Sequence, residues 1–113
     1  MCAIIGFASK DKKIDRNLLI AGRDTMIHRG PDDGGEWWTE DGCVGFGHRR
    51  LAIIDLSKAG YQPMHNITKD LTIIFNGEIY NHLELREKYL STETFDTQSD
   101  TETLIKLYAK FKN

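Results

Sequence analysis

The sequence predicts an α+β fold with antiparallel strand pairing, on three observations. The expected elements run strand, helix, several strands, helix, helix, so the strands form a block instead of alternating strictly with helices. Asp41-Gly42 stands between two of the strand segments and is a strong hairpin signal, which favours antiparallel pairing. The 113 residues have room for one domain at most.

The first strand is expected over residues 2–8, where CAIIGFA is rich in β-forming residues and is followed by the polar run SKDKK. Asp15 then provides an N-cap for a helix that runs to Met26, before a Gly-Pro stop signal. Further short strands are expected at residues 35–40, 43–50, 50–56 and 71–75. The loop KAGYQPM separates the last two, and the last strand runs directly into NGEIYN.

Two helices are expected in the C-terminal third, because capping-box spacings precede them. Asn81 and Glu84 have this spacing before a helix over residues 83–90, and Ser99 and Glu102 repeat it before the last helix. An apolar face follows at helical spacing, formed by Leu104, Ile105, Leu107, Tyr108 and Phe111. Core packing is its simplest interpretation. Since little sequence remains to cover it, we expect a fragment, or a chain that borrows a missing layer.

Charge and composition exclude several classes of partner. The 15 basic and 17 acidic residues give a net charge of −2, and no basic cluster favours nucleic acid or an anionic membrane. The N-terminal sequence lacks the charged n-region and long apolar h-region that are typical of a signal peptide, and no apolar run is long enough to span a bilayer. We therefore expect a soluble, cytoplasmic protein. Cys2 and Cys43 are not expected to pair in a reducing compartment. The histidines lack metal-ligand spacing, so no metal site is expected.

Two adjacent arginines, Arg49 and Arg50, lead an apolar strand segment. Side chains alternate along a strand, so one of the two guanidinium groups should face the interior or a cleft. A buried arginine needs a partner, and its planar fork best suits a carboxylate. A surface salt bridge at the strand end is the other interpretation, and this stretch alone does not decide between them.

Two further stretches carry polar groups that a core would not need. In IIFNGEIYN, a kink with positive φ at Gly77 would turn a backbone N–H and the Asn76 amide toward one point, as in an oxyanion hole. A plain hairpin turn also explains this dipeptide and is favoured on this stretch alone. In QSDTE, Asp100 lies at a helix N-terminus, where its carboxylate either caps the helix or receives a ligand's ammonium group.

Taken together, these stretches complement an α-amino acid with a reactive carbonyl on its side chain. They supply a cation for a carboxylate, an anion for an ammonium group, and donors for an oxyanion. Cys2, directly behind the initiator methionine, is then the candidate nucleophile. A small apolar residue at the start of a strand is the alternative interpretation of this cysteine.

Several motifs in register make the sequence similar to class II glutamine amidotransferases over essentially the whole chain, residues 1–113. In chain order they are the Cys behind Met1, HRGPDDGG, GHRRLAIIDLS, QPM, NGEIYN and SDTE. They resemble the glutamine-hydrolysing asparagine synthetases more than the glucosamine-phosphate synthase or purine amidotransferase branches. Ala3 departs from the pattern, since family members usually have Gly or Ser there.

The resemblance implies an N-terminal-nucleophile hydrolase fold, a four-layer αββα sandwich, of which this chain would be the incomplete N-terminal part. It implies that Cys2 attacks the side-chain amide of glutamine and that Asn76 and Gly77 form the oxyanion hole. The implied substrate-binding residues are Arg50, with the main chain around Ile53 and Ile54, for the α-carboxylate, and Glu78 and Asp100 for the α-ammonium group.

The α-amine of Cys2 is a suitable base for this reaction. Its pKa of about 7.7–8.0, against about 10.4 for lysine, leaves far more free base at neutral pH. It can take the thiol proton and later pass it to the leaving ammonia. This role requires that Met1 be removed.

The resemblance also implies partners. In the complete enzyme, ammonia would pass to an ATP-dependent amidation, so ATP and magnesium would belong to a synthetase domain absent from this chain, and no cofactor is expected here. Expected partners are glutamine, the rest of the glutaminase domain, and a synthetase domain or partner chain, with a homo-oligomer as one arrangement. Two alternatives stay open: a truncated, catalytically silent module that binds glutamine or assembles with a partner, and another amidotransferase branch with a different acceptor.

Overall fold

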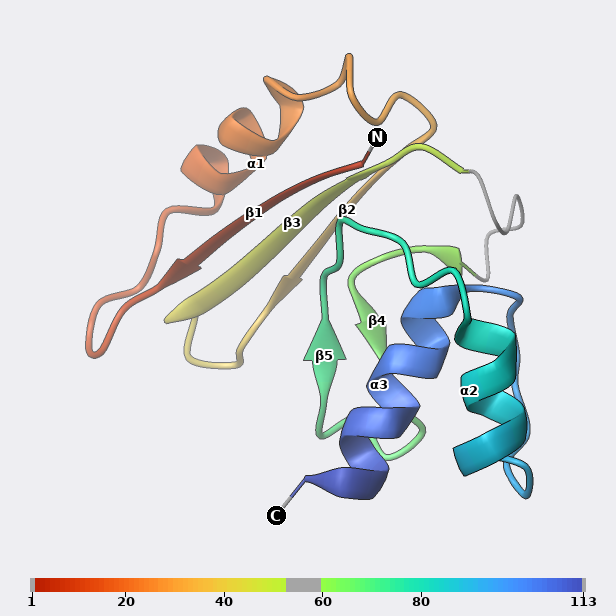
Figure 1. Ribbon diagram of the computed structural model, residues 1–113. Coiled ribbons are helices and arrows are strands. Elements are labelled where there is room, and N and C mark those ends of the chain that lie inside the picture. Colours follow the sequence, from red (N-terminus) through yellow and green to blue (C-terminus); the bar gives the residue numbers. More distant parts are fainter. Residues whose placement is uncertain (1, 53–59, 113) are drawn as a thin grey trace.

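A computed structural model describes residues 2–52 and 60–112 of the chain (Figure 1). The described part holds two small antiparallel sheets and three helices, so the predicted α+β class is confirmed. None of the described helices is long and apolar enough to cross a membrane.

The first sheet consists of β1 (Ala3–Ala8), β2 (Asp33–Trp38) and β3 (Val44–Arg50), with β3 in the centre and antiparallel to both neighbours. The hairpin predicted at Asp41-Gly42 joins β2 to β3 and is confirmed. Gly42 has a φ of 74°, which its missing Cβ allows, and its N–H closes the turn by donating to a backbone carbonyl at 2.9 Å.

One face of this sheet is covered by α1 (Arg16–Asp24), which lies across β1 and β3 (Figure 1). Asp15 caps the helix as predicted, because its carboxylate accepts a backbone N–H of the first turn at 2.9 Å. Leu19 is fully buried against the sheet. The helix ends before Met26, since the hydroxyl of Thr25 donates to a carbonyl of the preceding turn at 2.7 Å and competes with helix continuation.

The second sheet is the short pair β4 (Met64–His65) and β5 (Thr72–Ile73), on the side of the first sheet away from α1 (Figure 1). The strand predicted at residues 71–75 is therefore much shorter than expected. It ends early because the side chain of Gln62 takes the N–H of Phe75, at 2.6 Å.

The strand expected at residues 50–56 is not formed where the chain is described. β3 ends at Arg50, and Ala52 donates its N–H to the carboxylate of Asp32 at 2.8 Å. Residues 53–59, which include Ile53 and Ile54, lie outside the described residues.

The two predicted C-terminal helices are α2 (His82–Tyr89) and α3 (Asp100–Phe111). They pack against each other, and α3 also packs on β4 and β5. Ser99 caps α3 by accepting a backbone N–H at 3.1 Å, but Asn81 makes no side-chain cap bond for α2. The capping box predicted for Ser99 and Glu102 is therefore confirmed for Ser99 and wrong for Glu102. The carboxylate of Glu102 does not bind the N-cap residue but accepts the backbone N–H groups of residues 96–97.

The apolar face predicted for α3 is only partly core. Ile105 is buried, whereas Tyr108 and Phe111 expose 60% and 58% of their surfaces. The deepest positions lie in the polar first turn, where Thr101 and Thr103 are 2% and 0% exposed. Side chains of a neighbouring loop and of α2 hydrogen-bond both of these hydroxyls, so the first turn of α3 is the part that is packed into the molecule.

Candidate functional site

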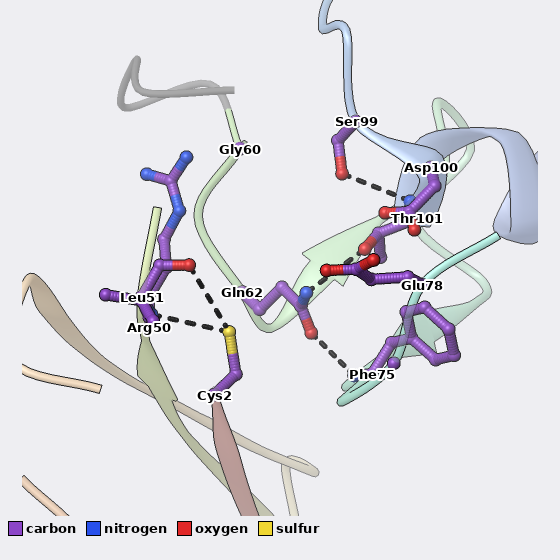
Figure 2. A pocket seen from close by; sticks show the side chains of 11 residues that line it. Cys2, Arg50, Leu51, Gly60, Gln62, Phe75, Glu78, Ser99, Asp100 and Thr101 are labelled. Atoms are coloured by element: carbon purple, nitrogen blue, oxygen red, sulfur yellow. Dashed lines mark hydrogen bonds between the residues drawn. The ribbon is translucent and has the colours of Figure 1, made fainter. Parts of the chain in front are cut away.

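A pocket of about 60 Å³ opens between the first sheet and the N-terminus of α3. Figure 2 shows residues of the first sheet on one side, Glu78 and the start of α3 on the other, and Gln62 between them. The lining residues are Cys2, Arg50, Leu51, Gly60, Gln62, Phe75, Gly77, Glu78, Ser99, Asp100 and Thr101. The fold thus brings together segments that are far apart in the sequence.

Cys2 is half-buried directly before β1, at one side of the pocket. Its Sγ accepts the N–H of Leu51 at 3.3 Å and donates to the carbonyl of the same residue at 3.6 Å (Figure 2). Side chains alternate along a strand, and Ile5 points toward α1, so Cys2 lies on the opposite face. The same alternation that shapes the core therefore turns the thiol into the pocket.

The two adjacent arginines point to opposite faces of β3, as predicted. The Nη1 of Arg49 lies 3.5 Å from the carboxylate of Asp24 in α1. Arg50 lines the pocket, and its Nη1 donates to the carboxylate of Asp33 at 3.2 Å. Only 6% of Arg50 is exposed, so the alternative of a surface salt bridge is wrong. A buried guanidinium paired with a carboxylate is the arrangement that a fixed cation requires.

The surroundings of Arg50 hold it in place. Its guanidinium carbon lies 5.5 Å from the centre of the Tyr61 ring, a cation–π distance. The same tyrosine hydrogen-bonds Asp33, and this bond is the main cause that raises the pKa of the Tyr61 hydroxyl above its usual value. Asp33 therefore joins the cation and the aromatic ring, although the sequence analysis gave it no role.

The opposite side of the pocket carries the negative charges. Asp100 is the first residue of α3, is 5% exposed, and accepts the N–H of Ile79 at 2.9 Å. Gly77 and Glu78 are exposed at the rim. The alternative of a hairpin at Asn76-Gly77 is wrong, because β5 is followed by α2. Gly77 also lacks the positive φ that we expected, since Gly42 alone among the described glycines has one.

The structure brings most of the expected site residues together. Cys2, Arg50, Gly77, Glu78 and Asp100 all line this pocket. Asn76, in contrast, is not among the lining residues, and Ile53 and Ile54 lie outside the described residues.

Other lining residues were missed by the sequence reasoning. Gln62 and Thr101 both line the pocket, and the side-chain amide of Gln62 donates to the hydroxyl of Thr101 at 3.1 Å (Figure 2). The motif QPM was the only signal for Gln62, and it carried no chemical role. Thr101 gave no signal beyond its place in a helix start. Leu51 contributes only backbone atoms to the sulfur of Cys2, which no side-chain pattern can reveal.

A buried histidine in β3 contacts the segment that follows β5. His48 is 1% exposed, and its Nε2 lies 3.3 Å from the carbonyl oxygen of Phe75. Because a carbonyl can only accept, Nε2 carries the proton. Burial lowers the pKa of His48 to about 4, so the ring is neutral at pH 7.

The pocket therefore combines a thiol, a buried cation and two carboxylates. A zwitterionic amino acid has the complementary charges, and a thiol is a nucleophile for a carbonyl on its side chain. Among the described residues, no group of three or more His, Cys, Asp or Glu side chains is arranged to hold a metal ion.

Comparison with known proteins identifies the class. Residues 1–112 match the family described as a glutamine amidotransferase domain, and the chain belongs to this family. It is a class II glutamine amidotransferase domain, so the resemblance drawn from the motifs is confirmed.

Several of the similar curated proteins are glutamine-hydrolysing asparagine synthetases. The chain is 44% identical over 117 residues to glutamine-hydrolysing asparagine synthetase 1 of Bacillus subtilis (strain 168). This match covers 99% of the chain and 18% of the relative. It is 48% identical over 96 residues to the glutamine-hydrolysing asparagine synthetase of Zea mays, covering 85% of this chain and 16% of the relative. It is 38% identical over 110 residues to asparagine synthetase B of Escherichia coli (strain K12), covering 96% and 19%. The chain thus spans less than a fifth of the length of these relatives.

Proposed function

We propose that this chain carries the glutamine-hydrolysing site of an asparagine-synthetase-like amidotransferase, which converts glutamine to glutamate and ammonia. The observation that carries the proposal is the pocket, in which the thiol of Cys2 shares one space with the buried cation of Arg50 and the buried carboxylate of Asp100. In a complete enzyme, the ammonia would serve an ATP-dependent amidation elsewhere in the protein.

We assign the α-carboxylate of glutamine to Arg50, with backbone groups near Ile53 and Ile54 assisting, and the α-ammonium group to Asp100 and Glu78. Opposite charges at the two ends of the pocket would orient the amino acid so that its side chain extends toward the thiol.

Both main charges are fixed before a substrate arrives. Asp33 holds the guanidinium of Arg50 at 3.2 Å, and the N–H of Ile79 holds the carboxylate of Asp100 at 2.9 Å. Groups that need no rearrangement lose little conformational entropy on binding. The pre-arranged charges therefore support the assignment to an amino acid.

The reaction begins when the free α-amine of Cys2 takes the thiol proton and the sulfur attacks the side-chain amide carbon. Charge then develops on the amide oxygen, and we assign its stabilisation to the N–H of Gly77 and the amide of Asn76. The carbon–nitrogen bond breaks as the α-ammonium group of Cys2 protonates the leaving ammonia. Water then attacks the thioester carbon while the α-amine of Cys2 takes one of its protons. The sulfur–carbon bond breaks, the thiolate regains that proton, and glutamate leaves.

We further propose that the chain is part of a four-layer αββα sandwich. The described elements follow one another as α1, the first sheet, the β4–β5 pair and α3, which supports this order of layers (Figure 1). The second sheet has only two short strands among the described residues, so further strands of a longer protein would complete it.

The first test measures glutamate and ammonia released from glutamine by the whole chain, after mass spectrometry has shown that it starts at Cys2. The wild-type chain should release both in equal amounts, and Cys2→Ala should release neither while keeping its circular dichroism spectrum. Cys43→Ala removes the other thiol, outside the pocket, and should keep full activity. Equal release by Cys2→Ala overturns the proposal.

The assignment of the α-carboxylate is tested by Arg50→Ala. Because the cation would be lost, we expect the KM for glutamine to rise by about tenfold or more, in line with the loss of a charge-assisted hydrogen bond. An unchanged KM would remove Arg50 from the binding site.

The alternative is a catalytically silent module that binds glutamine or assembles with a partner chain or a second copy. It is favoured by an apolar groove of about 400 Å³ between β5 and α3, lined by Leu71, Thr72, Ile73, Leu104, Ile105 and Tyr108. A folded chain that starts at Cys2, binds glutamine and releases no ammonia would support this alternative.

A further inference from the structure

The segment that leads into the proposed oxyanion hole is held by side chains. Phe75 lies beyond the end of β5, and its N–H donates to Oε1 of Gln62 at 2.6 Å. The carbonyl of Phe75 accepts from Nε2 of His48 at 3.3 Å. Both peptide groups that flank this residue are therefore fixed, directly before Asn76 and Gly77.

Gln62 also binds the opposite element. Its Nε2 donates to Oγ1 of Thr101 at 3.1 Å, and this threonine follows Asp100 in the first turn of α3 (Figure 2). The orientation of the amide is unambiguous, because the backbone N–H of Phe75 can only donate and so must meet the oxygen. One carboxamide thus uses its oxygen for the 75–77 segment and its nitrogen for α3.

The backbone of Gln62 is anchored on the first sheet. A Cβ added to Gly35 of β2 would lie 1.9 Å from the carbonyl oxygen of Gln62, so the two backbones are in direct contact there. A side chain at Gly35 would push this loop away from the sheet. The backbone of Gln62 therefore contacts the sheet that carries Arg50. Its side chain hydrogen-bonds the segment before Gly77 and the helix that begins with Asp100.

We propose that Gln62 is a positioning residue that sets the spacing between the oxyanion donors, the ammonium-binding carboxylate and the thiol. This inference rests on the proposed function and extends it to a residue whose polar atoms both bind protein groups. Reacting groups must be held to a fraction of an ångström, and a displacement of about 1 Å costs roughly a hundredfold in rate. A bridge between the two sides of the pocket meets this requirement.

The test compares how fast Cys2 is alkylated by a diazo ketone analogue of glutamine and by iodoacetamide, which needs no amino-acid site. Intact mass and peptide mapping follow the adduct on the whole chain, starting at Cys2. For Gln62→Leu, we expect the maximal rate of inactivation by the analogue to fall by about tenfold or more. The iodoacetamide rate should stay within about twofold, because the thiol itself is not part of the bridge.

Thr101→Val is the second variant, which removes one hydroxyl and keeps the bond from Gln62 to Phe75. Since it loosens only the link to α3, we expect the half-saturating concentration of the analogue to rise by about threefold or more, with little change in the maximal rate. Hydrogen exchange gives an independent readout. The N–H of Phe75 should lose protection in Gln62→Leu and keep it in Thr101→Val.

Asn66→Leu is the matched control. Asn66 also accepts a backbone N–H, from Leu71 at 2.9 Å, and donates to the hydroxyl of Thr68 at 3.0 Å, but it lies in the turn between β4 and β5, outside the pocket. It should label like the wild type. A wild-type chain that the analogue does not label overturns the proposed function and this inference together. Wild-type labelling of Gln62→Leu, or an equal loss in Asn66→Leu, overturns the inference alone.

Discussion

The two sides of the pocket are held together by different kinds of bond. The side with Cys2 and Arg50 is built on the first sheet, in which β3 pairs with each of its two neighbours along six residues. The side with Glu78 and Asp100 adjoins a sheet of two-residue strands, and individual side chains connect its loops to α2 and α3. Backbone ladders tolerate most side-chain substitutions, whereas the second arrangement depends on single residues.

Arg86 in α2 is the clearest example of this dependence. Its Nε donates to the hydroxyl of Thr103 at 2.7 Å, and its two Nη groups donate to the carbonyls of Thr97 and Ser99 at 3.1 and 2.8 Å. Its guanidinium also lies 3.8 Å from the centre of the Phe95 ring. One side chain thus joins α2, the loop before α3 and α3 itself.

The largest predicted effect is therefore the loss of this side chain. Arg86→Met should lower the free energy of unfolding by about 2–4 kcal/mol, because several hydrogen bonds from a charged group are lost together. Urea unfolding measures the change. Arg29→Met changes an exposed arginine and should shift stability by less than about 0.5 kcal/mol. Equal effects of the two variants would contradict the comparison.

The same difference explains what could be predicted from the sequence. The strands of the first sheet, its hairpin and the alternation of Arg49 and Arg50 follow from local signals of period two and from turn chemistry. The side with Glu78 and Asp100 was harder to predict, because its hydrogen bonds join residues that are far apart in the sequence. Gln62, which ends β5 early by binding the N–H of Phe75, lies ten residues before the start of that strand. The residues around Arg86 in the sequence likewise do not indicate its three hydrogen-bond partners.

The apolar stripe of α3 shows the limit of periodicity in the same way. Its spacing predicted a continuous core face, yet Tyr108 and Phe111 are largely exposed and the polar first turn is buried. Periodicity reports which residues share a face, and only the packing of other elements decides which part of that face is covered.

The second prediction uses the buried histidine between the two sides. Burial lowers the pKa of His48 from 6.5 to about 4. Between these values the unfolded chain binds a proton that the folded chain does not, so stability falls as the pH falls. From pH 7 to pH 5, His48 alone should account for a loss of about 2 kcal/mol.

His48→Gln isolates this contribution, because the glutamine amide can still donate to the carbonyl of Phe75 but does not titrate. The free energy of unfolding is measured in urea at pH 7 and at pH 5 for both proteins. Its decrease between the two pH values should be about 2 kcal/mol smaller in His48→Gln than in the wild type. His28→Gln, at an exposed histidine, should keep the wild-type dependence. An unchanged pH dependence in His48→Gln would show that His48 is not the group responsible.

The smallest predicted effect compares two helix caps. Asp15 caps α1 behind the first sheet, and Ser99 caps α3 at the pocket. Asp15→Ala and Ser99→Ala should each cost about 1 kcal/mol of stability. Glutamine in the pocket should protect Cys2 from alkylation by the diazo ketone analogue. Only Ser99→Ala should weaken this protection, because it loosens the helix that carries Asp100. Equal loss of protection in both variants would show that the two sides of the pocket do not differ in this respect.

The central claim is that Cys2 is the nucleophile of an amino-acid pocket. It is tested most directly by the intact mass of the purified chain before and after exposure to the diazo ketone analogue, with and without glutamine. The account predicts a chain that lacks Met1 and gains one adduct, mapped to Cys2 and suppressed by glutamine. A chain that starts at Cys2 and gains no adduct, or gains one that glutamine does not suppress, would contradict it.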